Sequence, residues 1–148
     1  MKEEELKAFV KVVTEYFRGI TGMAAELFPP FIKDETTEFF NYTGIIGISG
    51  SRRGGVYYTA STVLLENFAF YILGPGDYGE DALYDLVGEM TNTIAGNIRE
   101  TFGSSFQISV PIVMKGQIDN LSLKLRPPVF IMPIEWNGHK SHLGIGLE

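Results

Sequence analysis

The chain has 148 residues and a formal net charge of −6, with 45% hydrophobic and 20% charged residues. This length is typical of one domain with a buried core, so we expect a single domain over residues 1–148. The acidic balance argues against nucleic-acid binding, which requires clustered Lys and Arg. The chain has no cysteine, which excludes disulfides, thiolate catalysis and Cys-ligated zinc. The beginning, MKEEELK, is acidic, unlike a signal peptide, and no apolar run approaches about 18 residues. We therefore expect a cytoplasmic protein with no membrane partner.

The first half of the chain alternates helix and strand signals. Residues 3–18 carry apolar side chains at helical spacing behind an acidic first turn, and predict a helix ended by Gly19 and Gly22. Residues 37–60 predict a β-hairpin whose turn is GSRRGG, because a phosphate-binding loop would need a following Lys and Ser or Thr. Residues 61–74 predict a second helix with Ser61 or Thr62 as its cap.

The second half predicts one long helix and then strands. The helix runs from about Glu80 to Phe102 and stops at Gly103. Three strands follow in 106–116, 122–136 and 139–148, with turn signals at Asn120, at Pro127-Pro128 within the second segment, and at Asn137-Gly138. Strands joined by tight turns favour an α+β domain, an antiparallel sheet with helices packed on it. We expect the aromatic residues at 39–40, 57–58 and 68–71 to belong to the core of this domain.

The long helix has an unusual polar stripe opposite its apolar face. At about 100° per residue, Glu89, Asn92, Gly96 and Arg99 all fall within about 40° of Asp85, and Gly88 lies beside them. Glycine costs a helix about 1 kcal/mol relative to alanine, so two glycines here suggest that another surface approaches closely. The alternative is a solvent-exposed polar face with no function. Asn97 falls among the apolar residues and is expected to be a buried amide bonded to the backbone.

The spacing Asp85-x-x-x-Glu89-x-x-Asn92 resembles the signature of the CheC/CheX/FliY family of chemotaxis phosphatases. The run GEMTNTIAGN and the closing strand that ends in GIGLE are most similar to the CheX branch, as is the presence of one signature rather than two. The family pattern also has a proline downstream of the asparagine, for which the candidate here is Pro111.

This resemblance implies dephosphorylation of the aspartyl phosphate of a CheY-type response regulator. Asn92 would position the attacking water and Glu89 would pair with the active-site Lys of the regulator. Asp85, Gly88, Gly96 and Arg99 would contact the partner. Mg²⁺ would be supplied by the regulator, with no cofactor or metal bound by this chain. The resemblance also implies a homodimer, and the apolar strands with few edge charges are compatible with one. A non-catalytic module that docks on a receiver domain or a flagellar switch component is the alternative.

Other catalytic patterns have little support. His139 and His142 lack the further ligands that zinc needs, and are expected to be surface residues of a hairpin. No G-x-S-x-G motif supports a hydrolytic triad, and the aromatic residues lack the basic neighbours of a nucleic-acid stacking platform.

Overall fold

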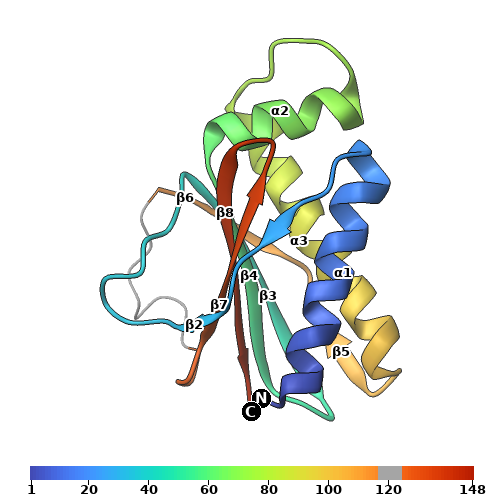
Figure 1. Cartoon of the computed structure of the whole chain (residues 1–148), viewed down its shortest axis with the longest axis vertical. Helices are drawn as coiled ribbons and strands as arrows, with labels where there is room; N and C mark the ends of the chain where they lie inside the picture. Colours follow the sequence, from blue (N-terminus) through green and yellow to red (C-terminus); the bar gives the residue numbers. More distant parts are fainter. Residues whose placement is uncertain (117–124) are drawn as a thin grey trace.

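The computed structural model describes residues 1–116 and 125–148, which form three helices and an antiparallel sheet (Figure 1). This architecture confirms the predicted α+β fold. In chain order the elements are α1 (Glu3–Thr21), β1 (Glu26–Leu27), β2 (Phe31–Ile32), β3 (Tyr42–Gly50), β4 (Gly54–Ala60), α2 (Thr62–Leu73), α3 (Glu80–Phe102), β5 (Phe106–Ile108), β6 (Ile112–Lys115), β7 (Phe130–Trp136) and β8 (His139–Leu147).

The sheet is built from two long hairpins whose edges are completed by short strands. Its order is β1-β7-β8-β4-β3-β5, with β2 also paired to β7 and β6 also paired to β3. The predicted hairpin of β3 and β4 is confirmed, with Ile46 opposite Val56. The β7–β8 hairpin turns at Asn137 and Gly138, whose positive φ angles of 51° and 76° suit a two-residue hairpin loop.

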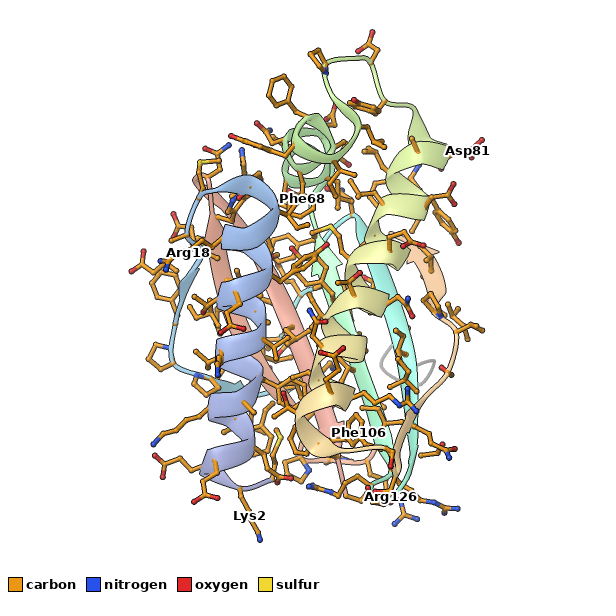
Figure 2. All side chains as sticks on the ribbon, turned by 90° about the vertical axis from the view of Figure 1, so that its right-hand side faces the viewer. Lys2, Arg18, Phe68, Asp81, Phe106 and Arg126 are labelled. Atoms are coloured by element: carbon orange, nitrogen blue, oxygen red, sulfur yellow. The ribbon has the colours of Figure 1, made fainter. Side chains whose placement is uncertain are left out.

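The helices cover one face of this sheet. Figure 2 shows α1 and α3 side by side on the sheet, with α2 across their upper end. Three aromatic rings join the layers: Phe68 of α2 lies 5.6 Å from Phe17 of α1 and 5.5 Å from Trp136 of β7, measured between ring centroids. All three side chains are fully buried. Aromatic packing of this kind therefore fixes α1 and α2 on the sheet.

The opposite face of the sheet has a smaller core of its own. Phe39, from the connection before β3, packs on Tyr57 of β4 with ring centroids 5.1 Å apart, together with Val129 and Ile131. The expectation that residues 68–71 are core is wrong in part, because Phe70 and Tyr71 are exposed. Ile72 and Leu73, at the end of α2, are exposed as well.

Several boundaries differ from the sequence expectation. Helix α1 continues through Gly19 and ends only at Gly22, whose φ of 74° is left-handed. The strand expected over 106–116 is divided into β5 and β6 around Pro111, which has no N–H for a sheet ladder. The strands β1 and β2 were not predicted, and β7 covers only the last part of 122–136. Asn120 and residues 122–124 lie outside the described residues. Within the described ranges, no helix is both long and apolar enough to cross a membrane.

Candidate functional site on helix α3

Two glycines allow α3 to lie close to the edge of the sheet. A Cβ on Gly44 of β3 would overlap the hydroxyl of Thr91 and lie 3.1 Å from the carbonyl oxygen of Val87. A Cβ on Gly88 of α3 would lie 3.0 Å from a methyl group of Val113 in β6, the residue opposite Gly44 in the sheet. These contacts fix the apolar face of α3, and so determine which side chains point away from the protein.

The residues of the predicted stripe are turned outward. Asp85, Glu89, Asn92 and Arg99 are exposed, whereas Gly96 is half-buried. Gly96 has open space around it, since no atom lies within 4 Å of the position that a Cβ would occupy. Gly88 differs, because it is buried against β6. Packing therefore accounts for Gly88, while the role of either glycine in partner binding stays a prediction.

Glu89 lies beside a surface hollow that the sequence did not predict. This hollow, of about 450 Å³, is lined by Tyr84, Asp85, Gly88, Glu89, Pro111 and Val113. The Tyr84 hydroxyl donates a hydrogen bond to the backbone oxygen of Val113, which links α3 to β6. The structure thus brings Pro111 to the same hollow as Glu89, although the two residues are far apart in the chain.

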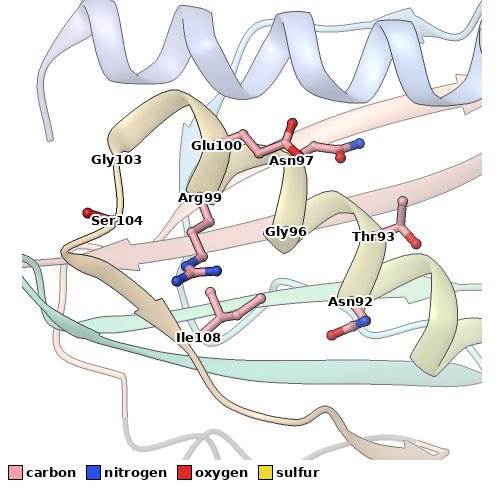
Figure 3. Close-up of a pocket in the computed structure, with 9 residues that line it drawn as sticks. All are labelled: Asn92, Thr93, Gly96, Asn97, Arg99, Glu100, Gly103, Ser104 and Ile108. Carbon is pink, nitrogen blue, oxygen red and sulfur yellow. The ribbon is translucent and has the colours of Figure 1, made fainter.

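Asn92 lies one helical turn further along, at a second hollow of about 500 Å³. Figure 3 shows Asn92 and Arg99 projecting from the same side of α3, toward Ile108 of β5. The Arg99 Nε donates to the backbone oxygen of Phe106 at 3.1 Å, so this side chain also holds the start of β5. Asn97 projects from the side that faces α1 and is half-buried, which corrects the expectation of a buried amide.

A third hollow, on the other side of Glu89, is mainly apolar. It has a volume of about 460 Å³ and lies between the three helices, with Tyr16 and Ile20 from α1 and Ile72 and Leu73 from α2. Burial, together with the charge of Glu89, raises the pKa of Tyr16, so its hydroxyl stays protonated at neutral pH. Glu89 therefore stands on a ridge between an apolar groove and the hollow at Pro111.

This arrangement offers a carboxylate, Glu89, and an amide, Asn92, on the exposed face of α3. Neither histidine lines any of the three hollows. Among the residues in 1–116 and 125–148, no cluster of three or more His, Asp or Glu side chains is placed to hold a metal ion. His142 is half-buried between the rings of Phe31 and Phe40, which corrects its expected place on the surface. The site is suited to positioning a reactant held by a partner.

Comparison with known proteins gives a family for this fold. The family model described as chemotaxis phosphatase CheX matches residues 42–135, which include β3, β4, α2 and the whole of α3. The chain belongs to the CheX family. No curated protein matches the sequence at a significant level.

Solved structures show the same CheX-like and CheC-like fold. A chemotaxis protein CheX from Vibrio vulnificus has a TM-score of 0.83 at 23% identity, with 98% of this chain and 99% of that chain covered. A CheC-like superfamily protein from a Shewanella species has a TM-score of 0.83 at 24% identity, with 100% and 99% covered. A CheX–CheY–BeF3–Mg²⁺ complex from Borrelia burgdorferi matches with a TM-score of 0.75 at 19% identity, with 97% of each chain covered.

The helix register alone was sufficient to find the exposed polar stripe, but not its surroundings. Helical spacing places Asp85, Glu89, Asn92 and Arg99 on one face whatever the tertiary structure. The residues that the sequence argument missed are Tyr16 and Ile20 of α1, Tyr84 of α3 and Val113 of β6, which reach the site from three elements. No sequence pattern links them, although the proline of the family signature pointed to Pro111.

Proposed function

We propose that this protein removes the phosphoryl group from the aspartyl phosphate of a CheY-type response regulator. Membership of the CheX chemotaxis phosphatase family supports a phosphatase, and the complex of a related fold with CheY supports a receiver domain as the partner. The observation that carries the proposal is the exposure of Glu89 and Asn92 on the outer face of α3, each beside a surface hollow.

Asn92 would position the attacking water. Hydrolysis of an acyl phosphate requires a water molecule in line with the bond from phosphorus to the aspartyl oxygen. A carboxamide can accept a hydrogen bond from this water while it donates another, and its protonation does not change with pH. Water attacks phosphorus, the bond to the aspartyl oxygen breaks, and inorganic phosphate and a free carboxylate result. Positioning of this kind lowers a barrier by reducing the entropy that is lost in the transition state.

Glu89 would anchor the helix over the phosphorylated site. Its carboxylate lies three residues before Asn92, so both side chains point to the same side. A salt bridge from Glu89 to the active-site Lys of the regulator would place Asn92 near phosphorus. The regulator would supply the Mg²⁺ that neutralises charge on the phosphoryl oxygens, so this chain would need no metal of its own.

The experiment is a turnover assay on a receiver domain from the same organism, preloaded with phosphate from a small phosphodonor. Catalytic amounts of the wild-type protein are expected to accelerate the release of phosphate over many turnovers, and Glu89→Ala and Asn92→Ala are expected to abolish this acceleration. Asn67→Ala is the matched control, since this amide lies on α2 and lines none of the three hollows. Full activity in both site variants would refute the roles proposed for them.

The same assay separates the enzyme from a docking module. A protein that binds the activated receiver without accelerating the loss of phosphate from any receiver of the organism would be a non-catalytic binding module. In that case substitutions of Glu89 and Asn92 would change affinity alone.

A further inference from the structure

The apolar groove between the three helices is a second feature of the surface beside Glu89. Three large apolar side chains at its rim are substantially exposed: Ile20 of α1 by 45%, Ile72 of α2 by 44% and Leu73 of α2 by 57%. Tyr16 and Leu86 are buried residues that also line the groove. Asp85 and Glu89 of the α3 stripe are its charged members.

The composition of α2 indicates that this surface is covered in a complex. The helix, TVLLENFAFYIL, has only one charged residue. A helix that is apolar on all sides is normally buried on all sides. Here Leu64, Leu65 and Phe68 face the core, whereas Phe70, Tyr71, Ile72 and Leu73 form a consecutive exposed run. Exposed apolar side chains that lie next to one another are characteristic of a protein-interaction site.

We infer that this groove, formed by Ile20, Ile72 and Leu73 around Glu89, binds apolar side chains of the phosphorylated receiver domain next to its active-site Lys. This inference rests on the proposed function and adds to it the surface that would select the receiver. Glu89 is itself one of the residues that line the groove, so a receiver whose Lys pairs with this carboxylate lies next to the apolar side chains of the groove.

Charge favours a receiver over a second copy of this chain as the occupant. No Lys or Arg is among the described residues that line the groove, so Asp85 and Glu89 have no cation of their own there. A two-fold contact through the same surface would bring these carboxylates toward their own counterparts. A receiver with a Lys among apolar side chains would instead pair a cation with Glu89 and cover the groove.

The test measures binding to a receiver domain held in its active state by beryllofluoride and Mg²⁺. Leu73→Gln and Ile20→Gln change the two sides of the groove independently, so the test does not depend on one variant folding. Val63→Gln is the matched control, because Val63 is 51% exposed on the same helix as Leu73 but does not line the groove. We expect about tenfold weaker binding and a correspondingly higher KM for each groove variant, and wild-type binding for the control.

The other outcomes are distinguishable. If both groove variants bind as tightly as the wild type, the inference is wrong while the phosphatase proposal stands. If they change the sedimentation of the free protein but not its affinity for the receiver, the groove is instead an interface between copies of this chain. If the wild type accelerates dephosphorylation of no receiver but binds one through the groove, the proposed activity fails and the docking surface is retained.

Discussion

Gly96 provides a direct test of why α3 contains glycine on its exposed face. The residue lies in the interior of a helix, and a Cβ there would contact nothing within 4 Å. Alanine would therefore fit without strain and would remove the cost of glycine in a helix, about 1 kcal/mol. For a domain of this size, that gain corresponds to a rise in Tm of about 3 °C. If a partner approaches this turn closely, however, the added methyl group would hinder it. We expect Gly96→Ala to be more stable and at least about tenfold lower in kcat/KM on a phosphorylated receiver.

The measurement combines thermal unfolding with the phosphate-release assay. Gly19→Ala is the matched control, because Gly19 also lies within a helix with no atom near its Cβ position and does not itself line any of the three hollows. The control is expected to gain stability and keep full activity. A Gly96→Ala variant that is more stable and fully active would refute the argument that close approach explains this glycine. A loss of stability would refute the argument from open space.

Two further predictions concern the parts of the fold that support the site. Gly44→Ala is expected to destabilise the protein by about 1–3 kcal/mol in urea unfolding, because the methyl group would overlap Thr91. Adding Thr91→Ala should restore part of this loss, and equal losses in the single and double variants would contradict the packing argument. Burial alone would raise the pKa of Glu5, but the Lys2 amide and the Arg52 guanidinium together hold it below 4.5. The ionised Glu5 carboxylate therefore contributes to the stability of the fold above about pH 4.5. This contribution is lost as the pH falls through the pKa of Glu5 in the folded protein. A Glu5→Gln variant should therefore lose less stability than the wild type on acidification, and an unchanged pH profile would count against the ion pair.

The long helix could be predicted from sequence because each of its signals is local. Its apolar period, its acidic start and Gly103 are all within the segment, and the observed bounds are Glu80–Phe102. The exposed positions of Glu89 and Asn92 follow from the same period. The local signal was misleading at Gly19, because helix α1 continues through this residue. The helix ends at Gly22, whose left-handed backbone terminates it.

The rest depends on contacts between distant parts of the chain. The strands β1 and β2 have two residues each, too short for an alternating pattern, and exist because they pair with β7. The sequence pattern assigns Gly88 to partner contact, whereas the structure shows Val113 of β6 packed against it. The apolar groove requires α1, α2 and α3 together, so no single segment of the sequence indicates it. The exposed apolar residues at the end of α2 were for this reason assigned to the core.

The most direct test of the account is a single-turnover measurement that separates the positioning of water from binding. Wild type and Asn92→Ala are each mixed in saturating excess with a phosphorylated receiver, and their affinities are measured separately with the beryllofluoride form. We predict that Asn92→Ala binds within about threefold of the wild type but releases phosphate at least about 100-fold more slowly, as expected when a group acts only in the transition state. If Asn92→Ala binds normally and releases phosphate at the wild-type rate, this amide does not position the water, and the central claim is wrong.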